Sequence, residues 1–200
     1  GLVGSEMCIR DSTTVAGTAN NSVITRVWTA TDENSNATTY TQTITVEDSV
    51  APAFTTSPAN ITVDCDASTL PADTNGPAVA TDNCDTSVTI TSADTTVAGT
   101  GNNSVITRVW TATDENSNAT TYTQTITVED SVAPAFTTSP ANITVDCDAS
   151  TLPADTNGPA VATDNCDTSV TITSADTTVA GTGNNSVITR VWTATDDNSN

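Results

Sequence analysis

The stretch VITRVWTATDENSN, residues 105–118, decides the fold that this sequence predicts. The same residues occur at 23–36, and residues 187–200 differ from them only in Asp197, which stands where the middle stretch has Glu115. An internal repeat is the first feature to establish, because its period fixes how the remaining sequence is divided. The tryptophans of the three stretches give a period of 82 residues: Trp28, Trp110 and Trp192.

This period predicts four segments. Residues 51–132 form a complete copy, residues 13–50 the C-terminal part of a copy, and residues 133–200 a copy truncated before its last strand. Residues 1–12 match the positions one period later at a single residue, so they do not belong to the repeat. We interpret them as a translated sequencing-adapter artefact, with an authentic linker as the alternative, and assign no function to Cys8 within them.

Period-2 alternation of apolar and polar residues predicts the strands of each copy. The longest are Ser104–Asp114 and Ala119–Val128, joined by a turn at ENSN. If they pair as a hairpin, Arg108 and Trp110 share an inward face and a row of threonines lies on the solvated face. The other predicted segments are strands at Ile61–Cys65, Ala78–Thr81 and Ser87–Thr91, and loops at Asp66–Pro77 and Ala93–Asn103.

No segment shows a helical period, so the predicted fold class is all-β, with tandem antiparallel β-sandwich repeats of 82 residues. Hydrophobic residues make up only 36% of the chain, and low hydrophobicity with high net charge is typical of disorder. The strict alternation and the cysteine pair in each copy argue instead for a folded domain. Because so small a domain buries a limited share of its surface, we expect a covalent cross-link.

The charge balance is strongly acidic, with 24 Asp and Glu against 4 Lys and Arg and a formal net charge of −20. This charge disfavours nucleic acid and anionic membranes as partners and makes divalent cations the natural counter-ions. No apolar run is long enough to span a membrane, so we predict no membrane insertion for this segment. The chain has no His, no Lys and no Ser with a base at a catalytic spacing, so we predict that it is not an enzyme.

Arg108 is the only basic residue of the complete copy, which contains ten acidic residues. It precedes Trp110 by two positions and shares its predicted face. We interpret Arg108 as a core residue whose stem covers Trp110 and whose guanidinium is ion-paired at the rim of the sandwich. The alternative is an Arg–Trp pair that contacts a ligand, but the threonine row marks the other face as the solvated one.

Three motifs of the repeat resemble the HYR (hyalin repeat) family of immunoglobulin-like modules: VWTATD at 109–114, TQTITV at 123–128 and ATDNC at 80–84. The resemblance covers the chain from Thr13 onward. It implies tandem immunoglobulin-like domains of a secreted or cell-surface protein, as in bacterial surface arrays, with an adhesive or spacer role rather than catalysis. Family members often carry a further cysteine pair where this chain has Asn116 and Tyr122, so its hairpin depends on packing alone.

Two copies contain a pair of cysteines each: Cys65 with Cys84, and Cys147 with Cys166. We predict a disulfide within each copy, closing about 20 residues, contributing roughly 3 kcal/mol and implying an oxidising compartment. The alternatives are free thiols, or a zinc site that is short of ligands because the chain has no His. If Ile61–Cys65 paired antiparallel with Ala78–Thr81, Cys65 and Cys84 would lie at opposite ends. The long loop must then cross back, or the first strand must run differently.

Acidic residues recur at the predicted joints between copies. In an immunoglobulin-like array, the end of one copy meets two turns of the next, such as Asp164–Asp167 and Asp196–Asn200. Converging carboxylates are the ligands that Ca²⁺ requires, and the alternative is a set of hydrated turn residues that bind nothing. The motif D-x-N-x-N in the ENSN turn lacks the Gly and the distal Glu of an EF-hand loop. The candidate calcium ligands are Glu47, Asp48, Asp82, Asp114, Glu115, Glu129, Asp130, Asp164, Asp196 and Asp197.

These observations predict a non-catalytic extracellular segment that acts as a spacer or stalk in a secreted or cell-surface adhesin-like protein. Its partners are the neighbouring copies of the same chain, and Ca²⁺ is the one cofactor that the sequence suggests. The first alternative is a module that binds a glycan or a surface protein through its turns, with many equal weak sites acting together. The second alternative is an accessory region of a secreted hydrolase.

Overall fold

The structure of the protein is a computed structural model that describes residues 7–200, with side chains from Thr13 onward. The interpretation of residues 1–12 as an artefact concerns residues that lie outside this description or whose side chains do, and it stays a prediction. The described residues contain no α-helix and one 3₁₀-helix, η1 (Pro153–Asp155), so the all-β prediction is confirmed. No helix in this part of the chain is long and apolar enough to cross a membrane. The strands are β1 (Met7–Ala16), β2 (Ser22–Thr31), β3 (Ala37–Val46), β4 (Ala53–Thr56), β5 (Ile61–Asp64), β6 (Val79–Thr81), β7 (Thr89–Ala98), β8 (Ser104–Thr113), β9 (Ala119–Glu129), β10 (Ala135–Thr138), β11 (Val161–Thr163), β12 (Thr171–Ala180) and β13 (Ser186–Thr195).

The contacts within the chain divide it into two units, which we describe separately. Each unit combines part of the middle copy with residues of a neighbouring copy. In the first unit, β1, β2 and β3 form an antiparallel sheet and β4 pairs with β6. In the second, β10 pairs with β11 and β12 with β13, again antiparallel. The first unit consists of Gly1–Ser57, Pro77–Ala93 and Val109–Thr123, and the second of Pro58–Gly76, Asp94–Arg108 and Gln124–Asn200.

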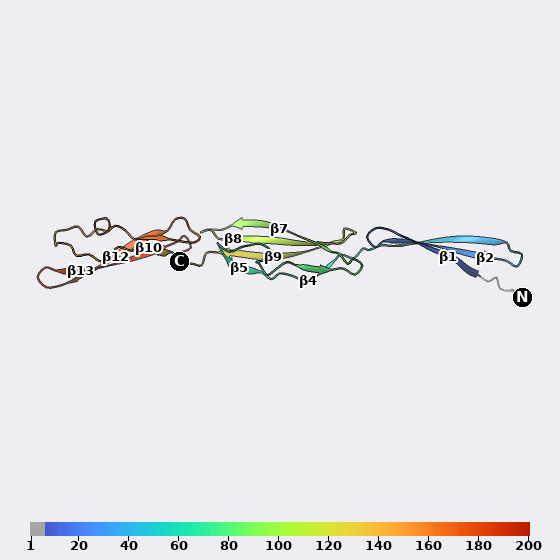
Figure 1. Ribbon diagram of the computed structural model, residues 1–200, viewed down its shortest axis with the longest axis horizontal. Coiled ribbons are helices and arrows are strands. Elements are labelled where there is room, and N and C mark those ends of the chain that lie inside the picture. The colour runs from blue at the N-terminus through green and yellow to red at the C-terminus, as the bar shows by residue number, and fades with distance from the viewer. Residues whose placement is uncertain (1–6) are drawn as a thin grey trace. The chain divides into compact units, whose positions relative to one another are not determined.

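The middle copy contains a sheet with the strand order β5-β9-β8-β7 (Figure 1). Its two central strands, β8 and β9, are the hairpin strands that the alternation of apolar and polar residues predicts. Every second residue of β8 from Ile106 to Ala112 is buried, and the residues between them are half-buried. On β9 every second residue from Gln124 to Val128 is buried, and the threonines between them are half-buried or exposed. The predicted inward and outward faces of this hairpin are therefore confirmed.

β5 pairs with β9 in parallel, in a register that joins Ile61 to Ile126 and Asp64 to Glu129. The prediction of a purely antiparallel sandwich is therefore wrong for this strand. β5 does not pair with β6, whose partner is β4. The sequence leaves open in which direction the strand before Cys65 runs. The parallel pair answers this, because it brings Cys65, directly after β5, to the level at which β9 ends.

The third copy shows that β5 depends on β9. Residues 143–146 repeat the ITVD sequence of β5 but form no strand, and Ile143 is 44% exposed. No strand pairs with this segment among the described residues, whereas β5 pairs with β9. The predicted core tryptophans also differ in exposure, but β9 alone does not explain this. Trp110 is only 3% exposed and Trp192 is half-buried, yet Trp28 is half-buried although β3 is the counterpart of β9. Tertiary pairing rather than local propensity therefore makes β5 a strand.

β7 is longer than the sequence predicts. The predicted loop Ala93–Asn103 is strand as far as Ala98, so this assignment is wrong over that part. The chain reverses only at Gly101 and Asn102, whose φ angles of 58° and 59° form a two-residue hairpin turn. Gly and Asn are the residues that such a turn favours, because both of its central positions have positive φ. The position of the turn, rather than the polar composition of the segment, thus ends β7.

Arg108 ties β8 to β7 and to the loop that follows β5. Its Nε and Nη2 each lie 2.8 Å from an oxygen of Asp94 on β7, in a two-pronged ion pair. Nη1 donates to the hydroxyl of Thr74 at 2.8 Å, and Nη2 also donates to the carbonyl of Thr69. Arg108 is only 2% exposed. These contacts agree with its interpretation as an ion-paired core residue.

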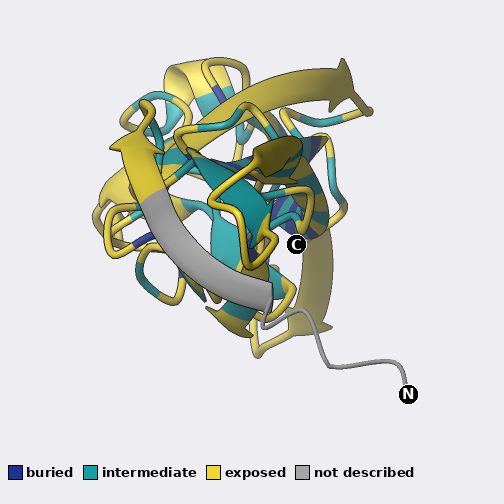
Figure 2. Ribbon diagram, turned by 90° about the vertical axis from the view of Figure 1, so that its right-hand side faces the viewer, coloured by how far each residue is buried: buried dark blue, intermediate teal, exposed yellow. Residues whose placement is uncertain are grey.

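The interior of the second unit is partly polar. Thr74, which is fully buried, donates from its hydroxyl to the carbonyl of Leu70 at 3.0 Å. Gln124 donates to the carbonyls of Thr74 and Ala59, both at 2.9 Å. Figure 2 shows how little of the ribbon is coloured as buried. The apolar cluster is correspondingly small: Ile106, Ile126 and Val128, with Ile61, Val63 and Cys65 packed against them.

In the first unit, an aromatic contact supports β4. The rings of Tyr122 and Phe54 lie with their centroids 6.1 Å apart and their planes tilted by 59°. Tilted pairs at this distance contribute roughly 0.5–1.5 kcal/mol beyond the area that they bury. Tyr122 therefore packs on β4 at the position where members of the resembling family often have a cysteine.

We expect the substitution Arg108→Met to lower the free energy of unfolding by about 2–4 kcal/mol, because it leaves Asp94 and Thr74 without their charged partner. The matched control is Arg26→Met in the first copy. The position one period before Asp94 is Ser12, so Arg26 has no counterpart of that ion pair. Urea unfolding followed by circular dichroism measures both variants. Equal losses in the two would contradict a specific role for the Arg108 contacts.

The ion pair also predicts a dependence on pH. The hydrogen bonds from Arg108 hold the pKa of Asp94 below its ordinary value of 3.8. A carboxylate with a lowered pKa in the folded state stabilises the fold above its unfolded pKa, and this contribution is lost as the pH falls through the folded value. We expect the stability difference between the wild type and Asp94→Asn to be constant at neutral pH and to shrink below about pH 4. Melting temperatures between pH 7 and pH 2.5 measure it, and a difference that does not change with pH would contradict the assignment.

Candidate metal centre

Two groups of aspartates gather in the structure, one within each unit, and they are copies of each other. We name them by their first members, the Asp48 cluster in the first unit and the Asp130 cluster in the second. Each member of one lies 82 residues from its counterpart in the other. The Asp48 cluster contains Asp48, Asp82, Asp85 and Asp114, and the Asp130 cluster contains Asp130, Asp164, Asp167 and Asp196.

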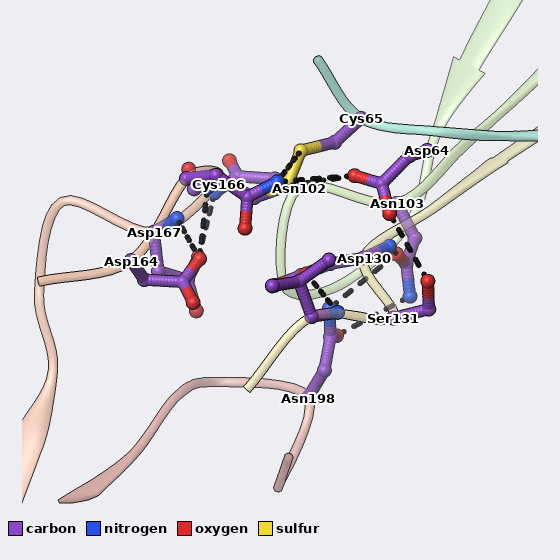
Figure 3. The surroundings of a disulfide bond; sticks show 12 residues. Asp64, Cys65, Asn102, Asn103, Asp130, Ser131, Asp164, Cys166, Asp167 and Asn198 are labelled. Carbon is purple, nitrogen blue, oxygen red and sulfur yellow. Dashed lines mark hydrogen bonds between the residues drawn. A yellow bond between two sulfur atoms is a disulfide. The ribbon is translucent and has the colours of Figure 1, made fainter. Parts of the chain in front are cut away.

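Three segments of the chain supply the Asp130 cluster, and Figure 3 labels its members Asp130, Asp164 and Asp167. Asp130 directly follows β9, Asp164 and Asp167 lie in the turn after β11, and Asp196 begins the turn after β13. Carboxylate oxygens of Asp130, Asp167 and Asp196 lie within 4.8 Å of one another. A second group, formed by an oxygen of Asp130, an oxygen of Asp164 and the sulfur of Cys166, lies within the same distance. Asp130 and Asp167 are 7% exposed and Asp196 is 6% exposed. The cluster thus brings carboxylates of two copies together away from solvent.

Backbone amides hold one oxygen of three of these carboxylates. Oδ1 of Asp130 accepts from the amide two residues later at 3.1 Å. Oδ1 of Asp164 accepts from the amides two and three residues later, at 2.8 and 3.0 Å. Oδ1 of Asp196 accepts from the amides two and four residues later, both at 2.9 Å. These bonds fix the orientation of each side chain, because the turn itself supplies the donors.

The second oxygens of the same three carboxylates have no donor. Oδ2 of Asp130, Asp164 and Asp196 is buried and lacks a hydrogen-bond partner among the described residues. Asp167 differs, since one of its oxygens accepts from the side chain of Asn102 and the other from the amide of Asp197, both at 2.7 Å. Burying a charged oxygen without a partner is costly. Three buried carboxylate oxygens of the cluster are therefore left without a donor among the described residues.

The hairpin turn between β7 and β8 also forms hydrogen bonds with residues of the Asp130 cluster. Asn102 donates from its side chain to the carbonyl of Cys166 at 2.8 Å as well as to Asp167. The next residue, Asn103, accepts from the amide of Asp130 at 2.9 Å. The left-handed backbone at Asn102 aims both asparagines at the cluster. The residues that make the tight turn therefore also position the acids.

The Asp48 cluster repeats these features in part, because Oδ2 of Asp114, unlike that of its counterpart Asp196, accepts from the side chain of Asn118 at 2.7 Å. Oδ2 of Asp48 and of Asp82 is buried and has no partner among the described residues. Asp85 and Asp114 are 5% and 7% exposed. The backbone amides of Cys84 and Asp85 hold the pKa of Asp82 below its ordinary value, so this side chain is ionised. Partial desolvation by the neighbouring atoms raises the pKa of the exposed Cys84 thiol, and the charges of Asp48 and Asp82 raise it further, so the thiol stays protonated.

One difference between the clusters follows from a difference in sequence. The hairpin turn has Gly101 in the second unit and Ala19 in the first. Asn198 donates to the carbonyl of Gly101 at 3.0 Å, and a Cβ on this glycine would collide with the Asn198 side chain. In the first unit, Asn116 donates instead to the carbonyl of Asp48 at 3.2 Å. The methyl group of Ala19 accounts for the changed direction of this asparagine.

The structure gathers some of the predicted calcium ligands and not others. The predicted residues that lie in the clusters are Asp48, Asp82, Asp114, Asp130, Asp164 and Asp196. Those whose side chains are exposed and outside the clusters are Glu47, Glu115, Glu129 and Asp197. Asp85 and Asp167 belong to the clusters although they are not among the predicted ligands. The D-x-x-D spacing of DNCD could have identified them, because a tight turn brings its first and fourth residues close together.

Cys65 and Cys166 form a disulfide beside the Asp130 cluster, with their Cα atoms 6.0 Å apart and a sequence separation of 101 (Figure 3). Cys166 is the counterpart of Cys84, so the bond joins the first cysteine of one copy to the second cysteine of the next. The predicted disulfides within a copy, Cys65–Cys84 and Cys147–Cys166, are therefore wrong. Cys84 and Cys147 are free and exposed.

The parallel pairing of β5 with β9 explains the disulfide. It places Cys65 where β9 ends, next to Asp130 and the turn that carries Cys166. Asp64 reinforces this arrangement, since it accepts from the side chain of Asn165 at 3.1 Å and from the hydroxyl of Ser131 at 3.0 Å. The disulfide and the hydrogen bond from Asn165 thus act between the same two segments, and the bond from Ser131 ties Asp64 to the residues that follow β9.

Searches of protein-family models and of curated proteins found no relative of this chain. It matches no protein-family model and has no significant match among curated proteins. The resemblance of its motifs to the HYR family therefore stays a prediction.

The electrostatics of the clusters point to one kind of chemistry. Two like charges at 4.8 Å repel by roughly 3 kcal/mol at an effective dielectric constant of about 20. The ion pairs within the described residues hold Arg108 on Asp94 and Arg190 on Asp176, so neither guanidinium is committed to a cluster. Convergent carboxylates without a basic partner suit the binding of a cation.

We expect peptide mapping without reduction to recover a cross-linked peptide that contains Cys65 and Cys166. The substitution Cys65→Ser should lower the free energy of unfolding by about 4–5 kcal/mol in the chain-entropy model, because the bond closes a loop of about 100 residues. Cys84→Ser is the control and should change stability little, since this thiol is free and exposed. Recovery of a Cys65–Cys84 peptide instead would contradict the structure.

Proposed function

We propose that the chain is part of a tandem array of immunoglobulin-like, HYR-like domains and acts as a non-catalytic spacer in a secreted or cell-surface adhesin-like protein. The antiparallel sheets are consistent with a β-sandwich, and the motifs around Trp110 support the immunoglobulin-like assignment. The chain has neither His nor Lys, which removes the commonest general bases and supports a role without catalysis.

The observation that carries this proposal is the set of bonds between consecutive copies within the second unit. The disulfide from Cys65 to Cys166 is covalent, and Asn102 bonds to the same turn through its side chain. On the third copy, Asn200 donates to the carbonyl of Asp130 at 3.1 Å. A spacer requires neighbours that keep one arrangement, and bonds from several segments supply that constraint.

The same features support an extracellular location. Disulfides persist in oxidising compartments and are rare where thiols are kept reduced. A net charge of −20 keeps a long array soluble and discourages its association with nucleic acid or anionic lipid. Nearly identical copies suit a spacer, because its length depends on the number of copies and not on their variety.

Distances between spin labels across each joint test the proposal. Labels on non-canonical residues at the exposed positions Thr39 and Thr121 span the joint within the first unit, and labels at the exposed positions Thr62 and Thr173 span the joint within the second, while the cysteines stay untouched. We expect one narrow distance distribution for each pair, measured by double electron–electron resonance on the 200-residue chain. Broad distributions for both pairs would contradict a spacer with fixed joints.

The alternative of a binding module is tested on the same protein. A glycan array probed with the chain should give no reproducible signal if the copies act only as spacers. Reproducible binding that weakens when the exposed turn residue Glu115 is replaced by Gln would favour recognition through the turns. The exposed Thr121→Ser variant of β9 is the control, because it lies on the strand face away from the turns.

A further inference from the structure

We propose that the Asp48 cluster and the Asp130 cluster each bind one calcium ion, which links the end of one copy to two turns of the next. The proposal concerns a ligand of the joints and stands apart from the spacer function, which the label distances test separately. Its ligands are the aspartates of the two clusters, and its evidence is the state of their oxygen atoms.

The first argument is the buried oxygens that lack a donor. In the Asp130 cluster these are Oδ2 of Asp130, Asp164 and Asp196. Asp130 and Asp196 are more than nine-tenths buried, so solvent does not replace the missing partners. Carboxylates that merely decorate a turn would direct both oxygens to water. Oxygens of Asp130, Asp167 and Asp196 lie within 4.8 Å of one another, and an oxygen of Asp164 lies within 4.8 Å of one of Asp130.

The second argument is that the site is organised by the backbone. The amides that follow Asp130, Asp164 and Asp196 in their turns bond to Oδ1 of each side chain and leave Oδ2 directed into the cluster. A ligand set held in this way needs little rearrangement to receive an ion. The arrangement is not an accident of one joint, because Asp48 and Asp82 leave the corresponding oxygens unpartnered in the first unit.

The donor atoms favour calcium over other metals. Ca²⁺ takes six to eight oxygen ligands at about 2.3–2.6 Å, so the oxygens around one ion lie at most about 5 Å apart. The grouped ligand atoms of each cluster lie within 4.8 Å of one another, which fits that limit. Zinc prefers nitrogen and sulfur, but the chain has no His, the sulfur of Cys166 is in a disulfide, and the Asp48 cluster has a single free sulfur beside it, that of Cys84. Mg²⁺ keeps several waters and seldom binds in a site with so many carboxylates.

The position of the ligands gives the ion a structural effect. Asp130 belongs to the end of one copy, whereas Asp164, Asp167 and Asp196 belong to two turns of the next. An ion held by all of them therefore opposes separation of the copies. It also neutralises part of the repulsion among the carboxylates, so its removal weakens the joint more than the loss of neutral contacts would.

Isothermal titration of the chelator-treated 200-residue chain with calcium chloride tests the proposal. We expect two sites in the wild type, one in Asp130→Asn, and none in the double variant Asp48→Asn with Asp130→Asn. Asn keeps the oxygen that accepts from the amide and replaces the unpartnered oxygen with a donor. Calcium should raise the melting temperature of the wild type by several degrees and leave that of the double variant unchanged.

The matched control is the double variant Glu47→Gln with Glu129→Gln. It removes the same charge from the exposed residues directly before Asp48 and Asp130. We expect it to keep two sites with affinities within about threefold of the wild type. Melting in chelator shows whether each variant is folded, and the Asn variants should melt no lower than the wild type there, because they lose a like charge.

Two results would overturn the proposal. The first is the absence of any calcium heat or melting shift in the wild type at millimolar calcium. The second is an equal loss of binding in the Glu control and the Asp variants, which would show diffuse attraction of counter-ions instead of a site. Either result would leave the disulfide and the narrow label distances, and hence the spacer function, unaffected.

Discussion

The pairing of β9 with a strand on each side is the constraint on which the rest of the middle copy depends. With β9 present, ITVD becomes β5, Trp110 is 3% exposed, and the Arg108 side chain is 2% exposed. In the third copy, the same residues occur without a counterpart of β9. There ITVD is not a strand, and the side chain of Arg190 is 15% exposed although it keeps its bonds to Asp176 and Thr156. The pairing of β9 with both β5 and β8 thus accompanies a buried interior, whereas β3, the counterpart of β9, pairs with β2 and leaves Trp28 half-buried in the first copy.

The parts of the fold that depend on local pattern are predictable from sequence, and those that depend on partner choice are not. Alternation over ten residues identifies both faces of the β8–β9 hairpin, because one face must contain Arg108 and Trp110. Four residues of β5 match any sheet edge equally well, so their parallel pairing with β9 cannot be deduced from the segment itself. The error in the disulfide follows from the same point, since the partner of Cys65 is decided by where β5 runs.

The candidate site divides in a similar way. That acids gather at the joints follows from their recurrence in turns at the end of each copy, which the sequence displays. Which carboxylates turn inward depends on the amides of each turn. Asp167 is buried, whereas Asp197, its neighbour in space, is exposed and contributes only its backbone amide, which donates to Asp167. A residue-by-residue choice among adjacent acids therefore needs the turn geometry and not only the composition.

The disulfide between copies has a mechanical consequence. In an array in which every joint carried the bond seen between Cys65 and Cys166, tension would pass from copy to copy through sulfur. Within each copy it would cross only the segment between the two cysteines, such as Cys147 to Cys166, a separation of 19 residues. Fully extended, that segment reaches about 65 Å, against about 280 Å for a whole copy. Even if all of its domains unfolded under load, such an array would extend to less than a quarter of the length that its fully extended chain would reach without the disulfides.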